Sequence, residues 1–337
     1  MSKARALVWS IAVFAAAVAA FGVFVVADLR RAGPRGEPVR VTVIEGASFA
    51  SVVRDLADRG LVRRAWTLEF FAKATRGDRQ IQRGTYEFPR GTPALDILRA
   101  MIRGDILAVF VTIPEGFTTW QIAGAMRAAG IDSVAMLSAC RDPDLRRALG
   151  VSAASLEGYL FPDTYRVPYG SDARDVVAQM LTRFHAAWSP DMERSAEAIG
   201  MTRHDAVTMA SIVEAEARVP DERPVVSAVY HNRLKRGMKL DADPTVAYAM
   251  DGFRGRLYFR DLQIDSPYNT YRHAGLPPGP ICSPGESSLR AAVHPEPSVG
   301  ALYFVARGDG RHVFSATLRE HDAAVRAVRR SGQAPGR

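Results

Sequence analysis

Cysteine is scarce in this chain, and histidine does not gather into metal-binding patterns. Cys140 and Cys282 are the only two cysteines in 337 residues, which is too few for a disulfide scaffold or a four-cysteine zinc site. We interpret both as unpaired apolar side chains, and a single disulfide stays open if the folded part is exported to an oxidising compartment. The seven histidines form no H-E-x-x-H motif or similar close cluster, so no metal is expected.

Motifs of several large enzyme classes are also missing. Neither a Walker A motif nor a dinucleotide-binding glycine fingerprint occurs, which argues against a nucleotide enzyme and predicts no cofactor. Ser211 lacks the G-x-S-x-G elbow, so acyl transfer is disfavoured. The formal charge is +8 and the sequence pI is near 9.8. The arginines are scattered, however, and no zinc-finger, RNA-recognition or homeodomain signature is present, so a nucleic-acid partner is not expected.

Long apolar runs are absent after residue 28, but one occupies the start of the chain. Residues 7–27 carry no charge, and at about 1.5 Å per residue they are long enough to cross a bilayer core of about 30 Å. A cleaved signal peptide is the alternative, but the run exceeds the usual apolar core of about 7–15 residues. We therefore predict an uncleaved membrane anchor (7–27) and a linker rich in Arg, Gly and Pro (28–38). Lys3 and Arg5 suit a cytoplasmic N-terminus (1–6), but Arg30, Arg31 and Arg35 follow the span, so the orientation depends on the family resemblance described below.

A small α/β module is predicted over residues 39–117. Alternation from Val39 predicts a strand, Ser48 a helix cap, residues 66–75 a second helix, and GTYEF (84–88) a strand. Thr92 and Pro93 open a further helix that turns Leu95, Leu98 and Met101 inward. The segments RGTYEF, PALDILRAMIRG and AVFVTIPEG resemble a LysM-like module, which binds amino-sugar polymers in its family. A plain spacer domain explains the same pattern equally well.

Two carboxylates lie on one predicted helix in the second half of the chain. The helix is capped at Thr202, and Glu214 and Glu216 fall on opposite flanks of its apolar stripe, each roughly 80° from the centre at 100° per residue. Periodicity does not choose between them. Upstream, LEGYLFPDTY (156–165) mixes Glu157 with aromatic residues, a mixture that suits a sugar groove but is also typical of a half-buried turn.

The polar segments after this helix are dense in turn signals. They are HNRL (231–234), GMKLDADPTVAY (237–248), SPYNTY (266–271) and GLPPGPICSPGESSL (275–289). They are hard to interpret as ordinary surface helices. Prolines and glycines fix backbone shape, and Asn232, Asp243, Thr245, Asn269 and Thr270 could orient a polar ligand. Each of these alone is more typical of a turn-stabilising side chain, but their crowding favours a site.

The ordered motifs ASIVEAEA, ER (222–223), NRL, GM-x-L, DPTV-x-Y, YNTY, GLPPGPI, SPG-x-x-SL, LYFV (302–305) and H-x-FS (312–315) resemble the endolytic murein transglycosylase G (YceG-like) family. LEGYLFPDTY is similar to its upstream motif. In that family the first Glu of SIVE-x-E is the catalytic acid/base, which corresponds to Glu214 here. Asp241 and Ala242 depart from the common pattern, in which a Gln followed by Ser or Thr stands, so the subsite contacts near Asp243 are less defined.

The resemblance implies a membrane-bound lytic transglycosylase that cuts the MurNAc–GlcNAc bond of peptidoglycan strands and leaves 1,6-anhydro-MurNAc ends. It places the catalytic domain outside the cytoplasmic membrane, beside wall synthases (penicillin-binding proteins), where it would end growing strands. Glu214 would be the acid/base, with its proton affinity raised by the apolar helix surface. Asn232, Asp243, Tyr268 and Asn269 would position the sugars, with Glu157 as a further candidate. A non-catalytic wall-binding adaptor and a water-using muramidase are the alternatives.

The predicted fold class is α+β, with a transmembrane helix, the LysM-like module, a YceG-like catalytic domain over residues 118–329, and a flexible tail at 330–337. Its last helix is expected to end near Val328.

Overall fold

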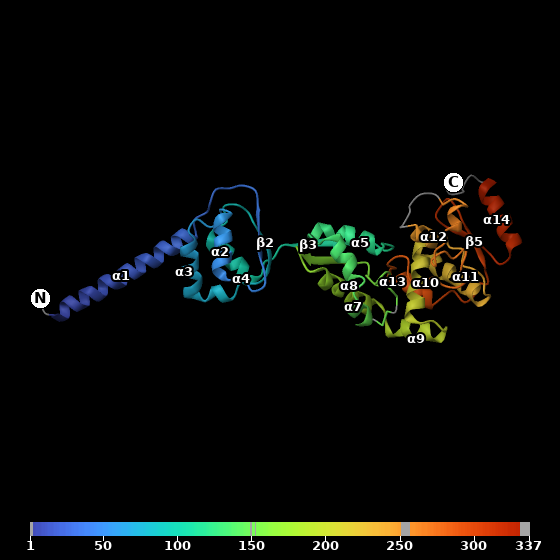
Figure 1. Ribbon diagram of the computed structural model, residues 1–337, viewed down its shortest axis with the longest axis horizontal. Helices are drawn as coiled ribbons and strands as arrows, with labels where there is room; N and C mark the ends of the chain where they lie inside the picture. Colours follow the sequence, from blue (N-terminus) through green and yellow to red (C-terminus); the bar gives the residue numbers. More distant parts are fainter. Residues whose placement is uncertain (1–2, 149, 152, 251–256, 331–337) are drawn as a thin grey trace. The chain divides into compact units, whose positions relative to one another are not determined.

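The computed structural model describes residues 3–148, 150–151, 153–250 and 257–330, and its mixed helices and strands confirm the predicted α+β class (Figure 1). Residues 331–337 of the predicted tail and residues 1–2 of the predicted N-terminus lie outside the described residues. The chain divides into two compact units. The small unit comprises Met1–Val109 and Arg166–Gly170, and the large unit comprises Phe110–Tyr165 and Ser171–Arg337.

The small unit is built around one antiparallel pair of strands. Its elements are α1 (Lys3–Leu29), β1 (Val39–Val43), α2 (Phe49–Asp58), α3 (Ala65–Thr75), a 3-10 turn (Gly77–Arg79), β2 (Gly84–Phe88) and α4 (Ala94–Arg103). β1 pairs with β2 so that Val41 faces Tyr86. As predicted, Ser48 caps α2, and its side chain accepts a hydrogen bond from the backbone N–H of Ser51.

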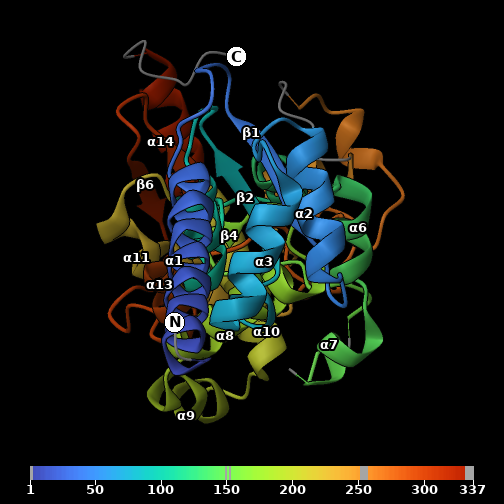
Figure 2. The same ribbon diagram turned by 90° about the vertical axis from the view of Figure 1, so that its left-hand side faces the viewer.

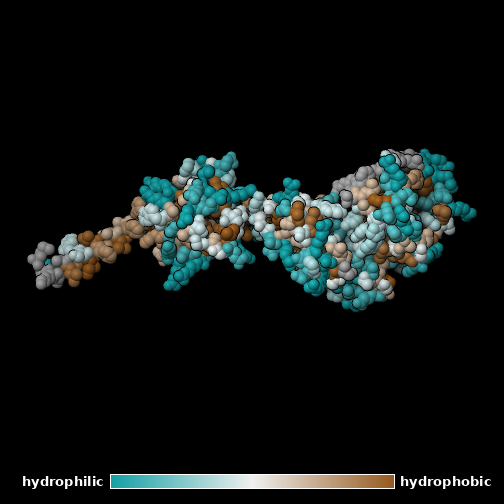
Figure 3. Space-filling view, viewed as in Figure 1, coloured by the Kyte–Doolittle hydropathy of each residue, from teal (hydrophilic) through white to brown (hydrophobic). Residues whose placement is uncertain are grey.

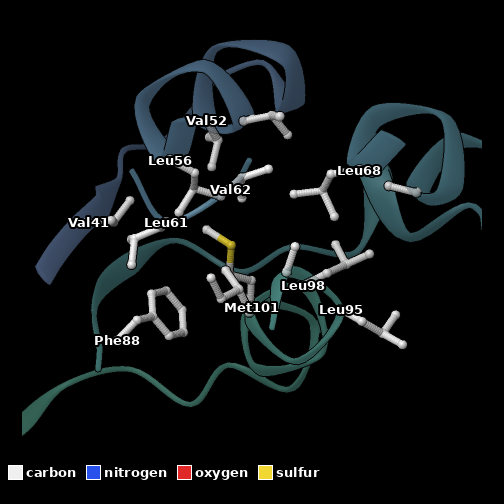
Figure 4. Packing of buried hydrophobic residues seen from close by; sticks show 14 of the residues in the cluster. Val41, Val52, Leu56, Leu61, Val62, Leu68, Phe88, Leu95, Leu98 and Met101 are labelled. Carbon is white, nitrogen blue, oxygen red and sulfur yellow. The ribbon is translucent and has the colours of Figure 1, made fainter. Parts of the chain in front are cut away.

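The core of the small unit gathers the apolar faces of these elements (Figure 4). Leu95, Leu98 and Met101 all point inward from α4, as the helical spacing predicts. They meet Val52 and Leu56 of α2 in the same buried cluster. α4 begins after Pro93, and the burial of side chains from every turn of the helix stabilises it.

Helix α1 has two environments along its length. Its residues Leu7–Leu29 have the length and composition of a membrane span or of a signal sequence, and only 6% of the apolar window is buried. Within the described residues it is the one helix that meets this criterion, and Figure 3 shows most of it as a brown, apolar rod. Its last turn behaves differently, since Val25 and Leu29 belong to the core of the small unit. α1 lies beside α3 in Figures 1 and 2.

The large unit is mainly helical. Its elements, some shared with the small unit, are β3 (Ala108–Thr112), α5 (Thr119–Met126), a 3-10 turn (Arg127–Ala129), α6 (Ser133–Ala139), α7 (Pro143–Ala148), β4 (Thr164–Pro168), α8 (Ala173–Ala187), α9 (Pro190–Ala198), α10 (Arg203–Glu216), a 3-10 turn (Pro220–Glu222), α11 (Arg223–Lys235), α12 (Asp243–Ala249), a 3-10 turn (Asp261–Gln263), α13 (Glu286–Val293), β5 (Tyr303–Ala306), β6 (His312–Ser315) and α14 (Leu318–Arg330). β3 pairs with β4, and both strands run from one unit into the other. β5 pairs antiparallel with β6.

Helix α10 is more deeply enclosed than its sequence predicts. The apolar spacing indicates one buried stripe, but every residue from Ala206 to Val213 is buried. Thr208 and Ser211 are buried with the rest, because the helix packs against neighbours that include α13 and α11. The single-stripe expectation is therefore wrong, and α10 is the central helix of the large unit.

Two of the segments expected to be turns are helical. HNRL (231–234) lies inside α11, and DPTVAY (243–248) lies inside α12. Both helices start with proline in their first turn, a position that proline tolerates well. His231 and Arg233 are buried, and each donates a hydrogen bond to a backbone carbonyl oxygen, His231 to that of Ala292 and Arg233 to that of Leu302, so neither polar group is left unpaired by its burial.

Candidate active site

Glu214 lies in the last turn of α10, held in place by the whole length of that helix. The helix starts at the predicted cap, Thr202, whose hydroxyl accepts from the backbone N–H of Asp205 while Asp205 accepts from that of Thr202. The burial of every residue from Ala206 to Val213 holds this helix in a fixed position within the large unit. Only 7% of the Glu214 side chain is exposed. A rigid helix thus presents one nearly enclosed carboxyl group.

Both oxygens of Glu214 accept hydrogen bonds from defined donors. Arg223, at the start of α11, donates from Nη2 to Oε1 at 3.0 Å. The backbone N–H of Gly285, the residue that precedes α13, donates to Oε2 at 3.1 Å. Besides the apolar helix surface expected from the sequence, a guanidinium and an amide N–H therefore also contact the carboxyl group.

A second carboxylate, Glu115, shares the same arginine. Its Oε2 accepts from Nη2 of Arg223 at 3.2 Å, and its side chain is 47% exposed. Burial raises the pKa of Glu115, the charge of Glu214 raises it further, and Arg223 acts in the opposite sense. One guanidinium between two carboxylates leaves one negative charge, and a single proton taken up by the pair would neutralise the cluster.

The close approach of Glu115 depends on a glycine. A Cβ atom added to Gly285 would meet Oε1 of Glu115 at 1.8 Å, which is far inside van der Waals contact. Gly285 therefore allows its backbone N–H to reach Glu214 while Glu115 packs against its Cα. The absence of a side chain at this position is what lets the two carboxylates approach the same arginine.

A cavity of about 660 Å³ opens beside this cluster. Ser287, which lines it, accepts a hydrogen bond from Nη1 of Arg223 at 2.6 Å. Its walls are formed by Glu115, Pro220, Pro224, Glu286, Ser287, Arg290, Ala291 and His294. The cavity is large enough to receive part of a ligand next to the acidic pair, and its wall combines apolar residues with charged ones.

Glu216 faces a different part of the large unit. Its Oε1 accepts from the hydroxyl of Tyr230 at 3.0 Å. Burial raises its pKa to about 7, and the hydrogen bond from Tyr230 opposes the shift. It lines a second cavity of about 300 Å³ together with Arg233 and Asp243. Among the described residues, Glu214 bonds to Arg223 and Gly285 whereas Glu216 bonds to Tyr230, as expected for side chains on opposite flanks of the helix.

Glu157 is buried beneath a row of aromatic rings. Its oxygens accept from the backbone N–H and the hydroxyl of Thr119, and from the hydroxyl of Tyr248 at 3.3 Å. Burial raises its pKa to about 7 despite these donors. The ring of Tyr248 lies 5.6 Å from that of Trp120 and 4.9 Å from that of Tyr268. These three aromatic residues form a partly exposed row.

The remaining predicted site residues make defined contacts of their own. The amide of Asn232 donates to the backbone oxygens of Val299 and Ala301. Asn269 is fully buried, and its amide holds two backbone oxygens of the preceding 3-10 segment. Asp243 is exposed and accepts from the hydroxyl of Tyr271 at 2.6 Å. Asn232 and Asn269 therefore tie segments together, while Asp243 and Tyr268 reach the surface.

Two members of the Glu214 cluster are missing from the sequence-based candidates. Arg223 is present only as half of the ER pair at 222–223, and Glu115 only as the second-last residue of AVFVTIPEG (108–116). The signal for Glu115 was the PEG turn shortly before the Thr118 cap, where a carboxylate follows proline and precedes glycine. In the described part of the chain, no group of three or more His, Cys, Asp or Glu residues could hold a metal ion. Cys140 and Cys282 are both free and buried, so the disulfide left open above is not formed.

Comparison with known proteins finds similarity over most of the chain. The YceG-like family model matches residues 41–327. An endolytic murein transglycosylase of Bacillus subtilis is 31% identical over 308 residues, covering 85% of this chain and 83% of the relative. One of Streptococcus pneumoniae is 28% identical over 321 residues, and the match spans 58% of that longer protein. The crystal structure of a yceG-like protein from Listeria monocytogenes matches 86% of this chain and 99% of its own, with 32% identity and a TM-score of 0.58.

Proposed function

Since this chain belongs to the YceG-like family, we propose that it is a membrane-bound endolytic lytic transglycosylase of peptidoglycan. The observation that carries the proposal is the environment of Glu214. A nearly buried carboxyl group ends a rigid helix, accepts from Arg223 and Gly285, and lies beside a second carboxylate and a cavity. This arrangement suits one acid/base that acts on a ligand held next to it.

One acid/base suffices because the substrate carries its own nucleophile. Glu214 donates its proton to the oxygen that bridges MurNAc and GlcNAc, and the bond between that oxygen and C1 of MurNAc breaks. The C6 hydroxyl oxygen of the same MurNAc attacks C1, and its proton passes to the Glu214 carboxylate. Intramolecular attack has a high effective concentration. The products are a 1,6-anhydro-MurNAc end and a free GlcNAc hydroxyl.

The Glu115 and Glu214 pair is proposed to hold the proton that Glu214 donates to the bridging oxygen and regains from the C6 hydroxyl. With Arg223 between them, the two carboxylates and one proton form a neutral cluster, and the raised pKa of Glu115 favours retention of that proton. Arg223 orients both groups, and its Nη1 is held by Ser287. We assign Glu115 and Arg223 as positioning residues in this reaction.

The glycan strand is proposed to lie across the aromatic row and into the cavity beside Glu115. Trp120 and Tyr268 offer ring faces to the apolar faces of the sugars. Asp243 offers acceptor oxygens to hydroxyl groups. Asn232 and Asn269 shape the surrounding segments through the backbone oxygens that they hold, and Glu157 supports the row through the hydroxyl of Tyr248.

Anchoring by α1 would hold the enzyme at the membrane where strands are made. We propose that α1 is an uncleaved span, that both folded units lie on the outer side, and that the enzyme ends strand elongation beside wall synthases. The apolar length of Leu7–Leu29 supports the span. The small unit has two helices between its paired strands, and this order supports the proposal of a LysM-like module over residues 39–117.

The test is muropeptide mass spectrometry after incubation of peptidoglycan with the purified full chain. Anhydro ends are expected from the native chain, and Glu214→Gln is expected to lower the rate by about 10²–10⁴-fold, the usual contribution of an acid/base. Glu216→Gln, two residues away on the same helix, is the matched control and should keep most of the activity. Thermal unfolding of both variants checks that the fold is retained.

The other outcomes separate the alternatives. Plain reducing ends would establish a water-using muramidase, and no cleavage by the folded native chain would support a wall-binding adaptor. Full activity of Glu214→Gln would overturn the assignment of the acid.

A further inference from the structure

The apolar helix α1 is joined rigidly to the small unit. Val25 and Leu29 are 2% and 1% exposed and belong to the same buried cluster as Leu68 of α3 and Leu95 of α4. The chain therefore does not leave α1 through a flexible tether that frees the unit. A membrane that surrounds the exposed apolar length of α1 would therefore lie close to the elements that pack on its last turns.

A buried ion cluster fixes α3 against the end of α1. The side chain of Asp28 is 3% exposed, and its carboxylate accepts from Arg63 at 2.5 Å and from Arg64 at 3.2 Å. The hydroxyl of Thr67 donates to its other oxygen at 3.0 Å. A buried carboxylate needs such partners, and their geometry sets the rotation of α1 relative to α3.

Aromatic contacts extend this junction toward the exposed part of α1. The ring of Phe21 lies 6.2 Å from that of Trp66 and 5.1 Å from that of Phe70, and Phe24 also lies 6.2 Å from Trp66. Trp66 and Phe70 nevertheless remain 47% and 48% exposed. Two large aromatic side chains therefore continue the apolar surface of α1 onto α3.

The depth of these rings follows from helix geometry. Leu7–Leu29 has 23 residues, or about 34 Å at 1.5 Å per residue, close to the thickness of a bilayer core of about 30 Å. Phe24 and Phe21 lie roughly 7 and 12 Å before the end of the span by the same rise. Trp66, whose ring contacts both, and Phe70, whose ring contacts Phe21, therefore lie beside the last third of this apolar length.

We propose that Trp66 and Phe70 of α3 insert into the interfacial region of the lipid bilayer and seat the small unit on the membrane surface. The proposal rests on the membrane anchorage in the proposed function. Tryptophan is enriched at this depth because its ring is amphipathic. Arg63 and Arg64, with their side chains 55% and 40% exposed, lie beside Asp28 where lipid phosphates are found.

Depth-dependent fluorescence quenching tests the proposal in the full chain. Single-tryptophan variants retain Trp66, Trp9 or Trp188 while the other tryptophans are changed to phenylalanine. Each is reconstituted into phosphatidylcholine vesicles whose acyl chains are brominated at successive depths. Trp66 is expected to emit at shorter wavelength than in water and to lose intensity most with bromine near the headgroup. Trp188, buried in the large unit, should keep its intensity.

The control at Trp9 separates two kinds of failure, since it lies within the candidate span. Quenching of Trp9 without quenching of Trp66 would overturn the interfacial seat and leave the anchor standing. Absence of quenching at both would overturn the anchor, and the seat with it. Quenching of both Trp9 and Trp66, with Trp66 quenched most by bromine near the headgroup, supports the proposal.

Spin labels provide a measurement that keeps every tryptophan. Phe70→Cys is labelled on α3, and Arg54→Cys, an exposed position on α2 of the same unit, is the matched control. Cys140 and Cys282 are buried, so labelling of the introduced cysteine dominates. The label at position 70 is expected to collide more with oxygen than with a water-soluble nickel complex, and the label at 54 the reverse. Equal accessibility at both positions would contradict the proposal.

Discussion

Replacing Glu157 by glutamine should make the large unit resist alkaline conditions that weaken the native chain. Glu157 is 2% exposed, and burial raises its pKa from 4.5 to about 7. Between these two values the folded chain holds a proton that the unfolded chain has lost, so raising the pH favours unfolding. The stabilising effect of this protonated carboxyl is complete below pH 4.5 and is lost as the pH rises through about 7.

The magnitude follows from the size of the shift. A difference of about 2.5 pKa units corresponds to about 3 kcal/mol in the free energy of unfolding at 1.36 kcal/mol per unit. Glutamine does not titrate, and its amide can still accept from the backbone N–H of Thr119 and bond to the hydroxyl of Tyr248. Relative to the native chain, Glu157→Gln should therefore gain about 3 kcal/mol of stability between pH 4.5 and pH 8.

Urea unfolding at several pH values measures this gain. In a Trp9→Phe and Trp66→Phe background, the remaining tryptophans, Trp120 and Trp188, report the large unit alone. Glu197→Gln, at an exposed position of α9, controls for the loss of a surface charge. A stability difference between Glu157→Gln and its background that stays the same at every pH would refute the reasoning, because it would mean that this carboxyl group keeps its charge when folded.

Three further changes probe the site, its aromatic row and the small unit. Gly285→Ala should displace Glu115, since the new Cβ would overlap its oxygen, and should lower strand cleavage at least tenfold while thermal unfolding stays near that of the native chain; native cleavage rates would contradict it. Trp120→Ala should raise KM more than it lowers kcat, because burying a large apolar side chain against a sugar contributes about 1.5–3 kcal/mol, and an unchanged KM in steady-state kinetics would show that the Trp120 ring does not contact the glycan. Leu98→Ala should destabilise the small unit by about 2–5 kcal/mol, measured by urea unfolding with Trp66 as the reporter, and a change below 1 kcal/mol would show that the core relaxes around it.

Local patterns predicted the helices that carry the site but not the contacts that complete it. The starts of α10 and α2 were predicted correctly at Thr202 and Ser48, because hydrogen bonds between residues close in sequence determine where a helix begins. Arg223 contacts Glu115 although 108 residues separate them. Helical or strand periodicity does not predict this contact, because it depends on how α11 and α13 pack around α10 and on the position of the segment before α5.

The helices α11 and α12, which the sequence did not predict, show that tertiary contacts also decide secondary structure. α11 and α12 contain Asn232 and Asp243, residue types with low helix propensity that favour turns when they stand in water. In the folded chain, Asn232 bonds to backbone oxygens of a distant segment. Tertiary contacts of this kind outweigh propensity, and a single sequence does not display them.

The enclosure of α10 makes the position of the Glu214 carboxyl group depend on the stability of the large unit. Glu214 lies in the last turn of a helix whose eight residues from Ala206 to Val213 are all buried, so the packing of this helix sets the position of Glu214. A helix packed in this way cannot shift without disturbing its neighbours on every side. Heating should then abolish catalysis only when the large unit itself melts, and the enzyme should have no intermediate temperature range in which it is folded but inactive.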